Sequence, residues 1–448
     1  LNDNHYLDYV EEQNDVDITL NNAGGYNELL ARINTMLASG DPPDYMQIPF
    51  RERALYTSLA NEGFLLELEE ERIDEWENLR DAFKPISWEL SKVNGTIYGV
   101  PYQRFDPTPM MMFARTDWLF NLGIDPDDVR TIDDWYEMLR AFTYDDPDGN
   151  GEDDTYGYFG QGDVILLWTW ALAPAFGAGQ TQMVDGEIQP PYIQPEWAEW
   201  LKFMNRLYEE GILDPDFVTS NNQDQQEKAA SGKYGAWLFF WHITEQIGRG
   251  IPRETWTPIA PPLGPDGEQS RYLYNGPLRQ WLAISADSEH ADKVLQVLDW
   301  GLSQEGGRYV QAGLPEIDYD LVDGNVVIHE DRKGVSWAWR SAMLGLQRNR
   351  LDGEYGELVE QVWGQLGSEW LEYSNEWGGY DEIGVLLPAF PETVDYDLQA
   401  QADEFVYQAI LGQVDIDAEF DDWVAQWRSS GGDIWIEKAT EYYLENLQ

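Results

Sequence analysis

The chain has 448 residues and a formal net charge of -55 at pH 7, because 83 Asp and Glu outnumber 28 Lys and Arg. Such a charge repels phosphate backbones and anionic lipid headgroups, which makes nucleic acids and membrane surfaces poor partners. The acids are spread over the chain, as expected of a solvated surface suited to saline or alkaline surroundings; a cationic ligand is the alternative. The length predicts about two or three domains, and the absence of cysteine excludes disulfides, thiolate metal sites and a cysteine nucleophile.

The first elements in chain order predict a βαβ unit. Residues 15–20 alternate like a short strand, and apolar residues between Tyr26 and Leu37 then recur at helical spacing. Residues 45–48 follow as a second strand. A strand, a helix and a strand in such a short stretch predict a parallel sheet with helices on its faces.

Further segments follow the same two periodicities. They are a strand at 97–99, helices at 131–142, 197–208 and 291–298, and a proline-rich crossing or linker segment at 256–265. The helix at 131–142 has the clearest start, because Thr131 is a favoured N-cap residue and Asp134 stands three positions later. That helix leads directly into an acidic loop.

The acidic loop at 146–154 has the spacing of a calcium ligand set. Oxygen donors fall at positions 1, 3, 5, 7 and 9 of an EF-hand-type loop, with Gly151 at the sharp-turn position 6. These donors are Asp146, Asp148, Asn150, the Glu152 carbonyl and Asp154. Position 12 is Gly157 in place of the bidentate Glu of a sensor EF-hand, and no helix signal follows. We therefore predict a structural calcium clip; an acidic turn-rich loop without metal is the alternative.

Several kinds of catalytic motif are absent. The chain has neither the glycine-rich phosphate loop nor the dinucleotide motif, and it lacks a nucleophile elbow. None of the four histidines, His5, His242, His290 and His329, stands at metal-ligand spacing from another. Paired carboxylates are compatible with a glycosidase, but among 83 acids no pair is distinctive.

Aromatic residues point to a saccharide ligand. The chain holds 21 Trp and 25 Tyr, several of them clustered with arginine or amide residues. Indole faces stack on the apolar faces of sugar rings, and neighbouring polar groups bind the hydroxyls. Because a single Trp is more often part of a core, the inference rests on the total number.

Seven stretches in order along the chain resemble the extracellular solute-binding proteins of bacterial ABC importers. The family includes alginate-oligosaccharide-binding proteins and Gram-positive sugar-binding lipoproteins. The stretches are Val93–Pro101, Arg115–Leu119, Thr131–Leu139, the acidic loop with Thr155–Gly157, Leu207–Leu213, Ala229–Lys233 and Ala409–Gln413.

The resemblance implies an α/β, two-lobed periplasmic-binding-protein-like (type II) fold with a hinge between the lobes. The lobes are expected to be discontinuous: residues 1–104 with about 266–335, and residues 105–265 with about 336–448. Family members of this kind carry a calcium ion in the second lobe. Thr155 stands at loop position 10, where the family often has Glu, so the chain lacks that ligand.

The resemblance also implies a monomeric, non-enzymatic importer component that works with ABC permease subunits. It is expected at a Gram-positive cell surface or in a periplasm, tethered through a lipid anchor upstream of Leu1. An upstream signal segment and the family's first strand are expected there too.

The expected ligand is an oligosaccharide between the lobes. The residues predicted to line its cleft are Tyr102, Gln103, Arg104, Trp168, Trp170, Trp237, Trp241, Asn275, Arg279, Trp337, Trp339, Arg340, Trp377 and Tyr380. The Trp residues would stack on sugar rings, and the amide and arginine residues would bind hydroxyls or a uronate carboxylate. The alternatives are a polysaccharide-degrading glycoside hydrolase and a peptide-binding receptor of the same fold.

Overall fold

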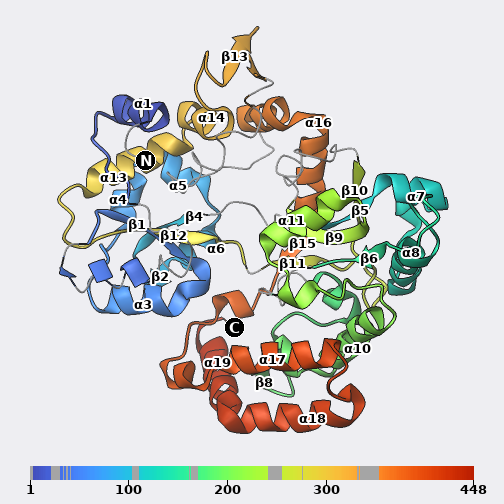
Figure 1. Cartoon of the computed structure of the whole chain (residues 1–448). Helices are drawn as coiled ribbons and strands as arrows, with labels where there is room; N and C mark the ends of the chain where they lie inside the picture. The colour runs from blue at the N-terminus through green and yellow to red at the C-terminus, as the bar shows by residue number, and fades with distance from the viewer. Residues whose placement is uncertain are drawn as a thin grey trace. The chain divides into compact units, whose positions relative to one another are not determined.

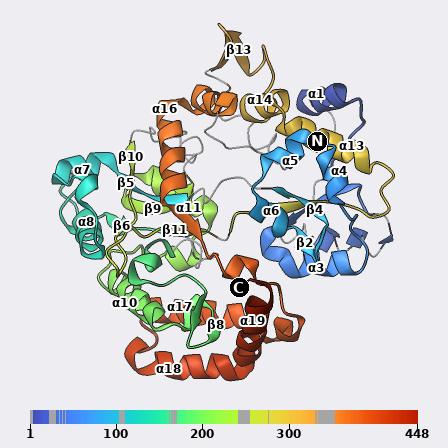
Figure 2. The same ribbon diagram turned by 180° about the vertical axis from the view of Figure 1, so that it is seen from behind.

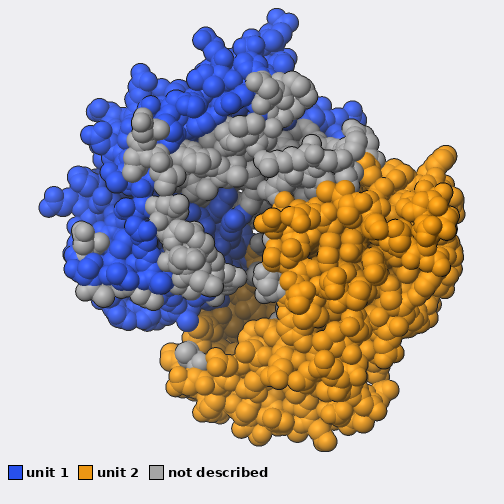
Figure 3. Space-filling model, viewed as in Figure 1, with its two compact units in different colours: residues 1–106, 277–369 blue, residues 107–276, 370–448 orange. Residues whose placement is uncertain are grey.

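The chain divides into two compact units, each built from two separate segments. Unit 1 comprises residues 1–106 and 277–369, and unit 2 comprises residues 107–276 and 370–448 (Figure 3). The chain thus passes from one unit to the other after residues 106, 276 and 369. The sequence predicted these boundaries after residue 104 and near residues 265 and 335. The computed structural model describes residues 4–21, 31–33, 35–36, 39–40, 42–102, 110–160, 162, 170–240, 255–274, 276–329, 332 and 353–447.

Unit 1 contains a three-stranded sheet in the order β1-β12-β4 (Figure 1). Its strands are β1 (Tyr45–Pro49), β4 (Gly99–Tyr102) and β12 (Gln280–Ile284). The central strand β12 is antiparallel to both neighbours. Its residue Leu282 lies opposite Gln47 of β1 on one side and opposite Val100 of β4 on the other. The prediction of a parallel sheet here is wrong, because a strand from the second segment of the unit lies between the two early strands and runs opposite to both.

Helices pack on this sheet to form the core of unit 1. Its described helices are α1 (His5–Asn14), η1 (Phe50–Glu52), α3 (Arg53–Asn61), α4 (Glu70–Asp74), α5 (Glu77–Ala82), α6 (Pro85–Glu89), α13 (Ala291–Leu302) and α14 (Gln304–Ala312). The core joins Val10, Leu79, Leu282 and Leu295, which come from both segments. On another part of the sheet, Tyr56 stacks on Trp281 with ring centroids 4.0 Å apart.

The predicted βαβ unit at residues 15–48 is only partly present. Residues 16–21 have no regular structure, so the predicted strand at 15–20 is wrong, and a helix, α1, precedes them. Asn4 caps that helix by accepting hydrogen bonds from the backbone N–H groups of Tyr6 and Leu7. The described residues among 31–39 are helical, and β1 confirms the second strand.

Short hairpins complete unit 1. They are β2 (Lys92–Val93) with β3 (Thr96–Ile97), and β13 (Tyr319–Val322) with β14 (Asn325–Ile328). The long helix α16 (Gly353–Trp377) continues past residue 369 into unit 2, and Gly364 within it has non-helical angles of φ 74° and ψ 173°.

The first sheet of unit 2 has the order β10-β5-β9-β6. Its strands are β5 (Met110–Arg115), β6 (Tyr156–Tyr158), β9 (Tyr234–Phe240) and β10 (Trp256–Ile259). Every residue of β5 is buried, as expected of a central strand covered on both faces. Because β10 pairs with β5, the proline-rich residues 256–265 begin as a strand of unit 2, and the prediction of a crossing segment is wrong at that point.

Unit 2 also contains two further pairs of strands and the helices described below. These pairs are β7 (Gln182–Val184) with β8 (Glu187–Gln189), and β11 (Tyr272–Tyr274) with β15 (Gly378–Tyr380). The helices are α7 (Thr116–Leu122), η2 (Pro126–Asp128), α8 (Ile132–Tyr144), η3 (Trp170–Phe176), η4 (Pro191–Ile193), α10 (Pro195–Glu209), η5 (Phe217–Thr219), α11 (Asn222–Ser231), η8 (Gly384–Leu386), η9 (Pro391–Tyr396), α17 (Leu398–Ile410), α18 (Ile416–Trp427), the π-helical turn Arg428–Gly432 and α19 (Asp433–Asn446). Both ribbon views place α17, α18 and α19 together at one end of the unit (Figures 1 and 2).

Helices α8, α10 and α13 confirm the three predicted helices. In α8 the apolar stripe of Trp135, Met138, Leu139 and Phe142 is buried, and the helix packs against β6 and β9. The packing of α8 on β6 and β9 therefore positions the acidic loop that joins α8 to β6.

Candidate functional site

The acidic loop lies between α8 and β6 in unit 2, held at both ends by regular structure. Helix α8 begins at the predicted capping box of Thr131 and Asp134, and its last residue, Tyr144, lies two positions before the loop. At the other end, the backbone N–H of Tyr156 donates to the carbonyl of Lys233, which directly precedes β9. The side chain of Asn121 on α7 also donates to the Pro147 carbonyl at 2.9 Å. The loop is thus anchored to α7, α8 and β9.

Two glycines give the loop its turn. Gly149 has φ +70° and Gly151 has φ +80°, a region that favours glycine because it carries no Cβ. The backbone N–H of Gly151 donates to both carboxylate oxygens of Asp146, at 3.2 Å each. The turn at loop position 6 thus folds back onto the acid at position 1.

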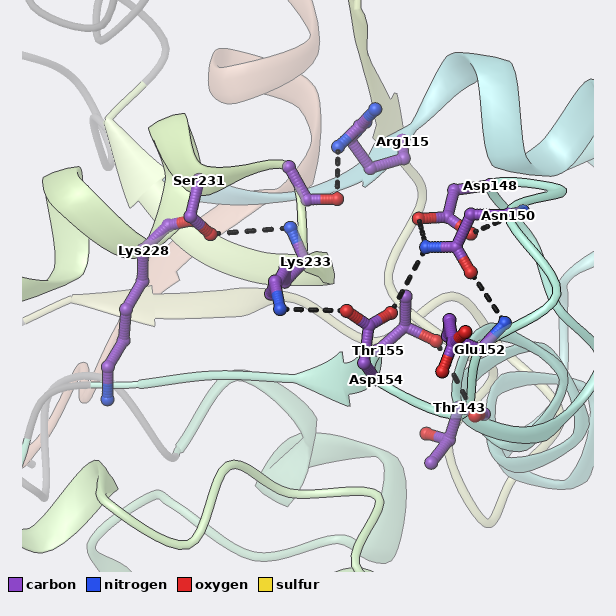
Figure 4. A network of polar contacts seen from close by, with 11 residues as sticks. Arg115, Thr143, Asp148, Asn150, Glu152, Asp154, Thr155, Lys228, Ser231 and Lys233 are labelled. Carbon is purple, nitrogen blue, oxygen red and sulfur yellow. Dashed lines mark hydrogen bonds and ion pairs between the residues drawn. The ribbon is translucent and has the colours of Figure 1, made fainter.

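The amide side chain of Asn150 lies among the acids of the loop (Figure 4). Its Nδ2 is 2.9 Å from Oδ2 of Asp148 and 3.3 Å from Oδ1 of Asp154. Its Oδ1 accepts a hydrogen bond from the backbone N–H of Glu152 at 2.6 Å. An amide nitrogen therefore stands between the carboxylates at positions 3 and 9.

A lysine from outside the loop binds its last acid. Nζ of Lys233 lies 2.7 Å from Oδ2 of Asp154 (Figure 4). The hydrogen bond from Lys233, followed by that from Asn150, lowers the pKa of Asp154 below its usual value. The same partner raises the pKa of Lys233. Lys233 belongs to the stretch Ala229–Lys233 noted in the sequence analysis. Its contact with the loop could not be predicted from the sequence, because the two are far apart along the chain.

The structure explains why loop positions 10 and 12 carry no acid. Thr155, at position 10, is buried, and its hydroxyl lies 3.5 Å from the Thr143 carbonyl of α8. Gly157, at position 12, lies in β6 against α8. A Cβ there would stand 2.2 Å from the Leu139 carbonyl oxygen and 2.9 Å from Cγ2 of Ile212. Close packing of β6 on α8 thus excludes any side chain at position 12.

The donors of the loop fit a calcium ion in kind and spacing. Carboxylates, an amide oxygen and a backbone carbonyl are the ligands that Ca²⁺ prefers, and the glycine turn supplies the bend that such a loop needs. Their side chains are instead held by N–H donors, as described above. Among the described residues, no group of three or more His, Asp and Glu side chains is arranged to hold a metal ion.

Two of the predicted ligand-binding aromatics are core residues. Trp237 on β9 is fully buried in unit 2, stacked on Phe159 at 5.0 Å and on Phe239 at 4.5 Å between ring centroids. Tyr102, at the end of β4, is buried in the core of unit 1. Both side chains are buried in the cores of their units, and Phe159 and Phe239 stack on Trp237, so contact of these two rings with a ligand stays a prediction.

Three other predicted residues keep accessible surface. Arg279 is exposed in unit 1, where its backbone N–H donates to the Tyr102 carbonyl at 2.9 Å. In unit 2, Trp377 ends α16 and Tyr380 ends β15, and both are half-buried. Their roles in binding stay predictions.

The remaining predicted residues lie outside the part of the chain that the structure describes. They are Gln103, Arg104, Trp168, Trp241, Asn275, Trp337, Trp339 and Arg340. Trp170 is the first residue of η3, and its side chain also falls outside that part.

Tyr373 is an accessible aromatic that the sequence patterns did not single out. Its ring stacks on Trp377 with centroids 4.6 Å apart and planes 7° from parallel, and the residue is 37% exposed. The spacing of four residues within a helix is the signal that would have found it. Because each ring covers one face of the other, an outer face of the pair is the surface on which a sugar ring could stack.

Comparison with known proteins identifies the family. The model of the bacterial extracellular solute-binding protein family matches residues 6–308, and the chain belongs to this family. Lipoprotein LipO of Bacillus subtilis is 27% identical over 443 residues, covering 93% of this chain and 84% of LipO. No helix in the described residues is long and apolar enough to cross a membrane.

Solved structures share the fold over nearly the whole chain. The EF-hand mutant of Streptococcus pneumoniae FusA, an ABC-transporter substrate-binding protein in complex with fructo-nystose, has a TM-score of 0.75 at 19% identity, covering 99% of this chain and 96% of FusA. The alginate-binding protein AlgQ2, solved without calcium ion, has a TM-score of 0.73 at 19% identity, covering 98% and 93%. These matches confirm the predicted α/β, two-lobed solute-binding-protein fold.

Proposed function

We propose that this bacterial extracellular solute-binding protein captures an oligosaccharide and delivers it, unaltered, to the permease of an ABC importer. The observation that carries the proposal is the likeness along nearly the entire chain to FusA, whose structure holds fructo-nystose. AlgQ2, of the same fold, is named for binding alginate. Neutral and acidic sugar chains are therefore both ligand classes to test.

Binding in this proposal is by stacking and hydrogen bonding. The stacked rings of Tyr373 and Trp377 offer an apolar plane to a sugar face, and Arg279 offers a fork of N–H donors to hydroxyls or a uronate carboxylate. In such a mechanism the ligand favours a closed arrangement of two lobes, and the permease recognises the liganded protein. No bond of the sugar is made or broken.

We also propose that the loop at 146–154 binds a structural calcium ion. Asp146, Asp148, Asn150, the Glu152 carbonyl and Asp154 would hold it. The ion would offset two of the three negative charges of these ligands and tie α8 to β6. FusA was solved as an EF-hand mutant and AlgQ2 in a form without calcium ion, and both observations support the proposal for a chain of the same fold. The glycines at φ +70° and +80° support it from the loop itself.

Isothermal titration with neutral fructo-oligosaccharides, oligogalacturonides and alginate oligosaccharides tests the ligand class. We expect micromolar or tighter binding of at least one class. W377A should weaken that binding about tenfold, because a stacking plane is lost. W423A is the matched control, since Trp423 is also half-buried and stacked, on Phe405 at 4.4 Å, but within α18 of unit 2.

Two alternatives have distinct readouts. A polysaccharide-degrading hydrolase would release shorter sugars, which chromatography of the mixture after incubation would show. A peptide receptor of the same fold would bind a peptide panel and ignore all three sugar classes. Either result would replace the proposed function.

A further inference from the structure

Lys233 introduces a positive charge into the acidic loop from a separate part of unit 2. It lies 79 residues beyond Asp154, yet its Nζ is 2.7 Å from the Oδ2 of that acid. Its side chain is 53% exposed, and that of Asp154 is 35% exposed. Asp154 is thus the acid of the loop that the Lys233 ammonium group contacts.

The backbone of Lys233 is fixed while its side chain is not enclosed. The Lys233 carbonyl accepts the Tyr156 N–H at 2.9 Å, which fixes the start of the lysine beside the end of the loop. Half of the side chain faces water, so the ammonium group can leave Asp154 without breaking the backbone contact. Asn150 contacts the other oxygen of the same carboxylate at 3.3 Å.

We propose that Lys233 is an internal cation of the loop, which pairs with Asp154 in the metal-free protein and competes with calcium for that carboxylate. The inference rests on the proposed calcium site. A divalent ion at the loop centre repels a neighbouring ammonium group and draws on the same carboxylate. Calcium binding must break the ion pair. The free energy by which the pair stabilises the metal-free loop therefore reduces the free energy of calcium binding by the same amount.

The competition makes two linked predictions for the full chain. Replacing Lys233 by Met should lower the melting temperature of the chelator-treated protein, because the acids lose their counter-ion. The same variant should bind calcium roughly fivefold or more tightly. K233R, which keeps the charge, should resemble the wild type in both measurements. K233Q serves as a second neutral variant should K233M fold poorly.

Lys202 supplies the matched control for net charge. It lies on α10 and pairs with Glu199 at 2.9 Å and with Asp417 of α18, and neither acid belongs to the loop. K202M therefore removes one positive charge without changing the partners of the loop. Its calcium affinity should stay at the wild-type value, which separates a local effect from the general field of an acidic protein.

Titration calorimetry with calcium chloride alone, on chelator-treated proteins, decides the matter. Tighter binding by K233M and K233Q but not by K233R and K202M supports the competition. Equal, measurable calcium affinities in the wild type and all four variants would overturn the inference but would still support the proposed calcium site. An absence of calcium binding in every protein would overturn both, and the two failures are thus distinguishable.

Discussion

Thr181 donates two hydrogen bonds to Asp381, from its backbone N–H at 2.9 Å and from its hydroxyl at 2.5 Å, although 200 residues separate the two. The backbone N–H of Gly384 in η8 adds a third at 3.0 Å. Asp381 directly follows β15, so this carboxylate ties the segment after the aromatic pair to the segment before β7. It joins parts of unit 2 that are distant in sequence.

Desolvation of the half-buried Asp381 carboxylate predicts a pH dependence of stability. Burial raises its pKa above the usual value of 3.8, and the hydrogen bonds from Thr181 and Gly384 only partly oppose this. An acid whose pKa is raised by folding favours the folded state below its unfolded pKa and loses that contribution as the pH rises through its folded pKa. D381N should therefore gain stability relative to the wild type over the pH range from about 4 upward, where the wild type begins to lose this contribution.

Urea unfolding of both proteins at several pH values measures that difference. E382Q is the control, because Glu382 is the exposed neighbour and should show no such trend. A difference between D381N and wild type that stays constant over this pH range would refute the assignment.

Gly157 predicts a steric effect at loop position 12. G157A should destabilise the protein on the order of 3 kcal/mol, because its Cβ would meet the Leu139 carbonyl oxygen at 2.2 Å. A Cβ at Gly160 would have no neighbouring atom within 4 Å, so G160A should be close to neutral. Thermal or urea unfolding checks both, and equal stability of the two variants would contradict the close packing of β6 on α8.

Calcium should stabilise the folded protein if the loop binds it. Adding calcium to about 100 times its dissociation constant should raise the free energy of unfolding by about 2.7 kcal/mol relative to chelator. D148N should reduce the effect, whereas D153N should not, because Asp153 falls between ligand positions of the loop. Melting curves with calcium and with chelator test this; coincident curves for the wild type would exclude a bound ion.

Gln225 on α11 predicts a stabilising substitution. The residue is fully buried, and neither its Nε2 nor its Oε1 has a hydrogen-bond partner among the described residues. Because an unpaired buried amide costs about 1–3 kcal/mol, Q225M should raise the free energy of unfolding by an amount of that order. Q223M is the control, since Gln223 is exposed two residues earlier and bonds Glu227. Lower stability of Q225M would show that the amide has a partner in solution.

Local features of the fold were predictable from the sequence, and long-range ones were not. The capping box of Thr131 and Asp134 and the turn at Gly151 depend on residues a few positions apart, so their spacing predicts them. The place of β12 between β1 and β4 depends on strand pairs such as Gln47 with Leu282, which no local pattern specifies. Pairing of that kind decides the direction of strands in the sheet.

The candidate site divides in the same way. The loop donors were found by spacing, but Lys233 joins them through the fold. Trp237 shows the limit of composition, because an aromatic-rich stretch is equally suited to a buried strand and to a binding surface. The stacked pair of Tyr373 and Trp377 could have been found from its helical spacing, had the helix α16 been predicted.

The central claim is that the protein binds an oligosaccharide and does not cleave it. Native mass spectrometry of the full chain, mixed with neutral and acidic oligosaccharides, tests this claim most directly. We expect a complex of one protein with one sugar whose added mass equals that of the intact oligosaccharide, and free sugar of unchanged mass. A protein that gains no mass from any of these sugars, or that releases shorter ones, would contradict capture without chemistry.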